Sequence, residues 1–338
     1  MSIIHLDGFD SYASLGDLGM EYGVSGSNFS TSAGRFGGGA YGAGGYGQHI
    51  NRSIANISEV WTGFAFQFLS GSSNGQSSIL IFQSASGVEA ELCYAPGVNT
   101  LAAYRGDLQA SLGTVSWTPG SNYHWIEVHY KMSASVGIFE VWIDGVQVLN
   151  ITGANTTQYG SSSFNVVALG NEYSGENMSC YYDDWYILDP NTSPNTARLG
   201  DSKIETLTPA SDATPNNGTP SSGSSHFAMV DESQWSSANS LTLANTSGQE
   251  ELFGMGALSS TPANVWAVRV LGVAEKTDAG ACNLEAVCVS GGTEADGPSV
   301  PLLTGYSHVS GIFQTDPNTS AEWTYSGVNA MKSGFKVP

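Results

Sequence analysis

The sequence predicts an all-β protein, in which an antiparallel jelly-roll β-sandwich is followed by a second, smaller β-sandwich domain. Three observations predict this class. Apolar and polar residues alternate in period two over many short runs, as half-buried strands require. Glycine occupies 42 of 338 positions, and turn residues separate the runs at the short spacing typical of sandwiches. Charged residues make up only 12% of the chain, whereas exposed helix faces are normally filled with Lys, Glu and Arg.

The first predicted sandwich is built from strands that can be read in chain order. Its clearest turn is Asp144-Gly145, because both central residues of a two-residue hairpin turn need positive φ and Asp-Gly supplies it. The alternating runs that we assign to strands are 61–68, 78–82, 88–94, 125–130, 138–143, 146–149, 165–169 and 181–188.

We expect three regions along the chain: a jelly-roll domain over 1–190, a linker or long surface connection over 191–225, and a C-terminal β-sandwich over 226–338. The connection is predicted because prolines lie among Ser, Asn, Gly and Thr there. The elements expected after residue 190 are a short strand at 203–207, strands at 264–274, 282–290 and 312–315, and one or two helical turns within 322–331.

The charge balance excludes several kinds of partner. Ten Lys and Arg residues against 30 Asp and Glu residues give a formal charge of −20. So few cations cannot neutralise a run of phosphates, so we expect no nucleic acid and no anionic membrane surface as partner. The start at 1–7 lacks the basic and apolar parts of a signal peptide. We expect the surplus of acid to face solvent, where it keeps the protein soluble.

The four cysteines are expected to be buried free thiols. Cys282 and Cys288 lie six residues apart in one strand-like run, roughly 20 Å apart at the rise of a strand. They therefore cannot pair unless that run is broken. Cys93 and Cys180 could meet across neighbouring strands, and the residues leave that pairing open.

No catalytic, cofactor-binding or metal-binding residues are predicted. The segment 42–47 satisfies G-x-G-x-x-G, but it lacks the strand-to-helix context and the acidic residue that a dinucleotide site requires. His124 and His129 flank one strand at an odd spacing, so they point to opposite faces and cannot share a metal ion. No Cys and His residues have zinc-binding spacing.

A glycoside hydrolase would need two carboxyl groups within reach of one glycosidic bond. The nearest pattern is Glu140 with Asp144, but Asp144 belongs to the hairpin turn. Asp183 and Asp184 are adjacent, so one is expected on each face of its strand. This pattern predicts that the chain is not an enzyme.

The most aromatic segment, 181–186, offers a possible contact surface. Tyr181, Asp183 and Trp185 are the candidate residues for binding a glycan or a partner, because aromatic side chains supply large contact area at low entropic cost. The alternative is core packing, with Tyr182 and Tyr186 on one face of the strand and Tyr181 and Trp185 on the other.

Several segments occur in an order that resembles a known family. The segments 6–10, 34–38, 125–128, 142–145 and 182–189 together resemble the concanavalin A-like (laminin G-like) jelly-roll module of tailed-bacteriophage virion proteins. The segments 199–201, 204–209, 230–232 and 274–280, with the C-terminal segments 316–317, 323–324, 328–330 and 334–337, are similar to the region C-terminal to that module in the same proteins.

The resemblance implies a structural component of a tailed-phage virion, on the tail or the capsid surface and of decoration or fibre type. It implies a homo-oligomer whose partners are other virion proteins, with no cofactor, assembled in the host cytoplasm and located in the virion. The alternative that it leaves open is a lectin-like receptor-binding module that recognises host surface glycans.

Overall fold

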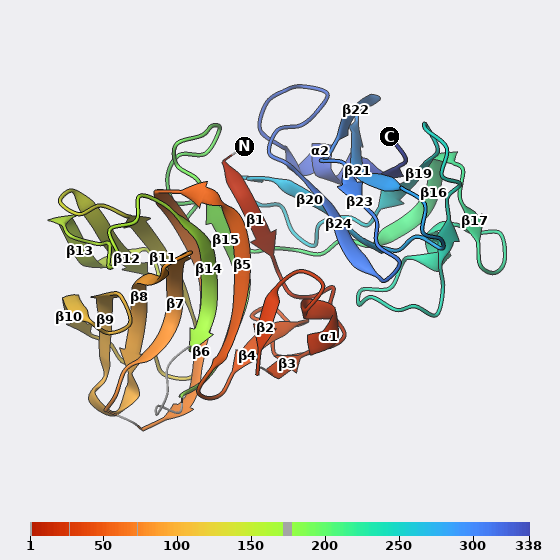
Figure 1. The fold of residues 1–338 in the computed structure, drawn as a ribbon. Helices are drawn as coiled ribbons and strands as arrows, with labels where there is room; N and C mark the ends of the chain where they lie inside the picture. The colour runs from red at the N-terminus through yellow and green to blue at the C-terminus, as the bar shows by residue number, and fades with distance from the viewer. Residues whose placement is uncertain (1, 27, 73, 172–177) are drawn as a thin grey trace. The chain divides into compact units, whose positions relative to one another are not determined.

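The computed structural model describes residues 2–26, 28–72, 74–171 and 178–338. The chain forms two compact units, Met1–Ile204 and Glu205–Pro338, and each is described by itself (Figure 1). Both units consist mainly of antiparallel strands, so the predicted class, a jelly-roll sandwich followed by a smaller sandwich, is confirmed. The α-helices of the described part, α1 (Leu15–Leu18) and α2 (Tyr325–Ala330), are too short to cross a membrane.

Unit 1 contains two large antiparallel sheets whose strands interleave along the sequence. The eight-stranded sheet has the order β13 (Val146–Ala154), β12 (Gly137–Ile143), β11 (Tyr123–Lys131), β6 (Glu59–Gly71), β15 (Met178–Leu188), β4 (Ala40–Ala43) and β3 (Asn28–Ser30), and β1 (Ile3–Asp7) also pairs with β15. The seven-stranded sheet has the order β10 (Ala110–Ser116), β9 (Thr100–Arg105), β8 (Gly87–Ala95), β7 (Ser77–Ser84), β14 (Phe164–Asn171), β5 (Gln48–Ile57) and β2 (Gly23–Ser25).

The core of unit 1 lies between these sheets and is rich in aromatic rings. Phe82 of the seven-stranded sheet stacks on Tyr130 of the eight-stranded sheet, with ring centroids 4.4 Å apart. Such offset pairs add to the free energy gained by burying the rings. The largest fully buried side chains include Trp125, Trp185, Tyr12, Tyr41, Tyr94, Tyr182, Phe9, Phe64, Phe66 and Phe139.

The hairpin between β12 and β13 is formed as predicted. Asp144 and Gly145 have φ angles of 50° and 81°, the left-handed values that this turn needs. Asp144 also accepts a hydrogen bond from the backbone N–H of Trp125 at 2.9 Å, which ties the turn to the neighbouring strand.

Strand β15 differs from the predicted alternation because it contains a β-bulge. Its pairing with β6 shifts between Asp183 and Tyr186, and Asp184 has a φ of 51°. One extra residue reverses the faces of all later residues in the strand. Tyr182 and Trp185 therefore share the core face, whereas Tyr186 contacts Trp125 and Glu127 on the outer face. The predicted pairing of Tyr182 with Tyr186 is wrong.

Unit 2 is the smaller sandwich. A six-stranded sheet, in which β23 (Val300–Pro301) also pairs with β21, packs against the pair β20 (Val268–Ala274) and β24 (Ser307–Phe313). The order of the larger sheet is β16 (Pro209–Asn216), β19 (Glu250–Met255), β25 (Lys332–Lys336), β21 (Asn283–Ser290) and β22 (Thr293–Asp296). The short strands β17 (Thr219–Pro220) and β18 (Leu241–Thr242) form a separate ladder. Helix α2 lies within the predicted segment 322–331.

The segment 191–225 is divided between the units instead of forming one connection. Residues 191–204 belong to unit 1, and 209–216 form strand β16 of unit 2. Because β16 is at the edge of its sheet, its prolines remove no hydrogen bond that the ladder needs. The short strand expected at 203–207 is not formed.

Among the described residues, ten of the chain's 30 acids lie inside the protein, so the expectation that the acid surplus faces solvent holds only in part. Asp7, for example, accepts from the backbone N–H of Phe9 at 2.8 Å and from the hydroxyl of Tyr22 at 2.7 Å. With few cations available, these carboxylates are satisfied largely by N–H and O–H donors. The buried acids are Asp7, Asp17, Glu89, Glu91, Glu127, Asp183, Asp184, Glu250, Glu251 and Asp316.

Candidate active site

The predicted contact residues Tyr181, Asp183 and Trp185 do not form a surface site. Trp185 is fully buried, where its ring stacks on Tyr22 and its indole N–H donates to the Thr62 hydroxyl at 3.0 Å. Asp183 is also buried. Tyr181 is half-buried. The bulge in β15 separates Trp185 from the other two, so these residues cannot offer one aromatic surface.

Asp183 and Asp184 form a buried acidic pair on the outer side of the eight-stranded sheet. Burial raises the pKa of Asp183, and the charge of Asp184 raises it further. Burial likewise raises the pKa of Asp184, against the opposing effects of the Ile204 N–H and the Arg35 guanidinium. Asp183 accepts from the backbone N–H of Arg35 at 2.7 Å, and Asp184 from that of Ile204 at 2.7 Å. The expectation that these two acids face opposite sides is wrong.

These contacts hold two chain segments over the outer face of the eight-stranded sheet. A third buried acid, Glu127, accepts from the backbone N–H of Gly200 at 2.8 Å and from the Arg198 guanidinium at 2.8 Å. The segments 34–39 and 198–204 therefore cover the middle of this sheet, and its carboxylates are used in holding them.

The outer face of the seven-stranded sheet holds a different buried acid, Glu91. Strands β5, β14, β7, β8 and β9 lie side by side there as one curved layer (Figure 1). One row of directly opposed residues crosses all seven strands and consists of Ser111, Tyr104, Glu91, Ile81, Ala168, Asn51 and Gly23.

The middle of this row is covered by neighbouring groups. Ile81, Ala168 and Glu91 have no exposed surface, whereas Tyr104 and Asn51, at the two sides, are half-buried.

Glu91 is the titratable group at the centre of this face. Its carboxylate accepts from the Ser78 hydroxyl at 2.6 Å and from the backbone N–H of Leu108 at 2.7 Å. Burial raises the pKa of Glu91 to about 7 in spite of these two hydrogen bonds, and the nearby charge of Asp107 raises it further. Near neutral pH, Glu91 is therefore able to hold a proton and to give it up.

Glu89, on the same strand, has its pKa shifted in the opposite direction. Burial would raise its pKa, but hydrogen bonds to its carboxylate outweigh burial and lower the pKa. Glu89 therefore stays ionised near neutral pH. Its donors are the Ser84 hydroxyl at 2.8 Å, the Thr157 hydroxyl at 2.9 Å, and the backbone N–H groups of Gln158 at 2.7 Å and Tyr159 at 3.1 Å.

A bulge lies between the two carboxyl groups along β8. Ala90 pairs with Phe82 while Val88 pairs with Gln83, so Glu89 is the extra residue. The bulge interrupts the alternation of faces, since Val88 packs with Ile81 whereas Ala90 belongs to the core between the sheets. Glu89 and Glu91 are two residues apart along the strand, with Cα atoms about 7 Å apart at strand rise.

Other groups around the pair can contact a bound molecule. Tyr104 lies directly opposite Glu91 on β9, and burial raises its pKa. The Tyr159 ring is 54% exposed and lies against Gly87 at the end of β8. Across the face on β5, the Nδ1 atom of His49 and the Oδ1 atom of Asn51 are buried without a hydrogen-bond partner, and burial lowers the pKa of His49.

The described residues contain no group of three or more His, Cys, Asp or Glu side chains arranged to hold a metal ion. The described cysteines are all free thiols, with Cys93 on β8 and Cys180 on β15 in different sheets.

Sequence reasoning missed Glu89 and Glu91 although their pattern is visible. The run 88–94 is predicted as a half-buried strand in which polar and apolar residues alternate. The signal was Glu-Ala-Glu within an otherwise apolar strand, because acids at that spacing have Cα atoms only about 7 Å apart. Most of the donors that set their opposite pKa shifts lie 13 to 70 residues away, and no local pattern contains them.

No family model and no curated protein matches this chain. Similar solved structures include alginate lyase Aly36B, with a TM-score of 0.41 and 14% identity over 54% of this chain and 95% of that one. The cellulose-induced protein Cip1 has a TM-score of 0.39 and 14% identity over 60% of this chain and 94% of that one. A Trypanosoma rangeli sialidase in complex with 2,3-difluorosialic acid has a TM-score of 0.41 and 11% identity over 58% of this chain and 32% of the sialidase.

These structures correct two predictions. They are an alginate lyase, a sialidase and a cellulose-induced protein, and none is a phage virion protein. The prediction of a tailed-phage structural component is therefore wrong, as is the prediction that the chain is not an enzyme. Glycan recognition, the alternative that the sequence left open, stays a prediction. Self-association and the absence of a nucleic-acid partner stay predictions. At these identities and TM-scores, any role for a residue has to rest on this chain's own geometry.

Proposed function

We propose that unit 1 is a carbohydrate-active enzyme domain that hydrolyses a glycosidic bond on the outer face of the seven-stranded sheet. The observation that carries the proposal is the pair Glu89 and Glu91. They lie two residues apart on β8, and their pKa values shift in opposite directions. Two carboxyl groups with separated pKa values are what acid and base roles in glycoside hydrolysis require.

The roles follow from the protonation states. Glu91 donates its proton to the glycosidic oxygen as the bond from that oxygen to the anomeric carbon breaks. Glu89 remains ionised, stabilises the positive charge that develops on the sugar ring, and accepts a proton from the water that attacks the anomeric carbon. One water is consumed, and both carboxyl groups return to their starting states by exchanging protons with solvent.

The substrate that fits this face is a neutral glycan. The nearby charge acting on Glu91 is another acid, Asp107, and the whole chain carries a formal charge of −20. A polyanionic chain would be repelled at this face. The Tyr159 ring offers a stacking surface for a sugar, and the buried polar atoms of His49 and Asn51 can hydrogen-bond to hydroxyl groups.

The test is the release of reducing ends from a panel of neutral polysaccharides (β-glucans, xylan, mannan, starch), with alginate and sialyllactose as anionic comparisons. We expect release from a neutral glycan and a loss of roughly 100-fold or more for Glu91→Gln, the size of a general-acid contribution. Glu140→Gln, which changes a carboxyl group of the eight-stranded sheet, is the matched control and should keep full activity.

Thermal unfolding of both variants shows whether they remain folded. No release from any neutral glycan would contradict the proposal, as would full activity of a folded Glu91→Gln variant.

A further inference from the structure

A second site lies in unit 2, on the outer face of its six-stranded sheet. Ser211 of β16, Gly254 of β19, Lys332 of β25 and Val289 of β21 are opposed in one row across four strands. Gly254 leaves a gap between a hydroxyl group and an ammonium group, since a Cβ atom at Gly254 would lie 2.4 Å from the Ser211 hydroxyl oxygen.

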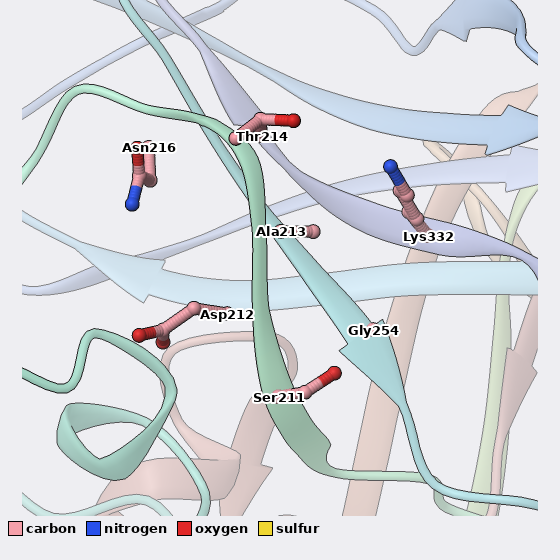
Figure 2. Close-up of a pocket in the computed structure, with 7 residues that line it drawn as sticks. All are labelled: Ser211, Asp212, Ala213, Thr214, Asn216, Gly254 and Lys332. Carbon is pink, nitrogen blue, oxygen red and sulfur yellow. The ribbon is translucent and has the colours of Figure 1, made fainter.

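This gap is part of an open depression of about 350 Å³, which is large enough for a small organic molecule. Figure 2 shows the Thr214 hydroxyl pointing toward the side of Lys332, whereas the Asp212 carboxylate points to the other side of β16. That carboxylate accepts a hydrogen bond from the backbone N–H of Phe227. The residues that line the depression are Ser211, Asp212, Ala213, Thr214, Asn216, Gly254 and Lys332.

The partners of the ammonium group distinguish Lys332 from Lys336 on the same strand. Both side chains lie on the outer face, because they are four residues apart in a strand. Lys336 is paired with Glu294 at 2.6 Å and with Asp296 at 3.4 Å. The Lys332 ammonium group makes no hydrogen bond or ion pair with any residue that the structure describes. It is therefore an ammonium group beside hydroxyl groups, with no acidic partner among the described residues.

We propose that this depression binds the oxyanion group of a small molecule. Lys332 supplies the charge, the Ser211 and Thr214 hydroxyl groups supply hydrogen bonds, and Gly254 supplies the space. Hydrogen bonds between an ammonium group and an oxyanion are among the stronger ones in proteins. The ligand class differs from the neutral glycan proposed for unit 1. The two proposals also depend on different residues, so evidence against one does not contradict the other.

The oxyanion group of the ligand is a carboxylate, a phosphate or a sulfate. The following experiment tells these three classes apart. The full chain is treated with a limiting amine-acetylating reagent, and acetylation of Lys332 and Lys336 is measured by peptide mass spectrometry. Sodium glucuronate, acetate, phosphate and sulfate are compared with sodium chloride at equal ionic strength, and glucose serves as the neutral comparison.

An oxyanion that binds should slow acetylation of Lys332 about tenfold at a concentration about ten times its dissociation constant, because only the free site reacts. Lys336 should be unaffected, and glucose should not protect either lysine. Ser211→Ala is expected to weaken the protection, and so is Gly254→Ala, whose added methyl group displaces the Ser211 hydroxyl.

Lys336→Gln, the matched change on the same strand, should leave protection of Lys332 intact. Equal acetylation rates of Lys332 in chloride and in all four oxyanions would overturn the proposal. Equal protection in wild type and in both folded site variants would also overturn it, since the hydroxyl and the gap would then have no role.

Discussion

Glu89 and Glu91 lie on strand β8 with a single residue between them, yet the pKa of Glu89 is lowered and that of Glu91 is raised to about 7. The difference lies in their donors. Four groups donate to Glu89, and two of them are backbone N–H groups of the segment 157–159. Glu91 receives only two such bonds. Burial therefore sets the direction of the pKa shift at Glu91, and hydrogen bonding sets it at Glu89.

The exposed ring of Tyr159 should contribute to substrate binding but not to bond cleavage. We expect Tyr159→Ala to raise KM roughly threefold to tenfold, the value of one aromatic contact, and to leave kcat unchanged. The backbone N–H of residue 159, which donates to Glu89, is kept in this variant. Steady-state kinetics on the glycan found in the panel is the measurement.

Phe36→Ala provides the control for Tyr159, since Phe36 is similarly exposed, at 59%, but lies in the segment 34–39 over the other sheet. Both variants should unfold at the wild-type temperature. A Tyr159→Ala variant with unchanged KM, or with kcat reduced as strongly as in Glu91→Gln, would contradict the assigned role.

The buried pair Asp183 and Asp184 should make unit 1 less stable as the pH rises. Folding raises the pKa of both groups above the usual value near 4. At pH values between the unfolded and the folded pKa, the folded state holds more protons than the unfolded state. The free energy of unfolding therefore falls as the pH increases through this range. We expect wild-type stability in urea to decline steadily from about pH 5 to pH 9.

Asp184→Asn tests whether the buried pair causes this loss of stability with rising pH. Asn tolerates the positive φ at residue 184, and its carbonyl oxygen can still accept from the Ile204 N–H. The variant removes one buried charge, so it should gain on the order of 1 kcal/mol over wild type at pH 9 and little at pH 5. Parallel stability curves for the two proteins across this range would show that the pair is not responsible.

Glu127 should be essential for holding the segment 198–204 on the eight-stranded sheet. The carboxylate is fully buried and accepts from Arg198, Gly200 and the Tyr186 hydroxyl. Removing it leaves a cation and two donors unpaired, so Glu127→Ala should destabilise unit 1 by about 3 to 5 kcal/mol. Limited proteolysis should also cut near residues 198–204 first. The control is Glu294→Ala, which removes an acid at the surface of unit 2. It should change neither the stability of unit 1 nor the site of first cleavage.

The fold could be predicted from the sequence largely because its signals are local. The period-two runs correspond to strands β6, β7, β8, β11 and β15, and Asp144-Gly145 forms its hairpin turn. The bulge at Asp183 and Asp184 could not be predicted. It depends on Arg35 and Ile204, which are distant in sequence, and it places Trp185 on the core face together with Tyr182.

The candidate site was harder to predict, because the sequence does not show which acids become buried on folding. An acid in an alternating strand is normally placed in solvent, and 30 acids against 10 cations suggested an acidic surface. In the structure, backbone N–H groups replace the missing cations as partners of buried carboxylates such as Glu89 and Asp183. Those partners exist only after folding, so residue types alone do not show them.

The proposed chemistry depends most directly on the separate protonation states of Glu89 and Glu91. Carbon-13 NMR of the full chain, with glutamate carboxyl carbons labelled, measures both, and spectra of Glu89→Gln and Glu91→Gln assign the two signals. We predict that the Glu91 signal titrates with a pKa of about 7 and that the Glu89 signal titrates below the usual value for glutamate. If both signals titrate together near the usual value of about 4.3, no proton donor exists at this face and the proposed function is contradicted.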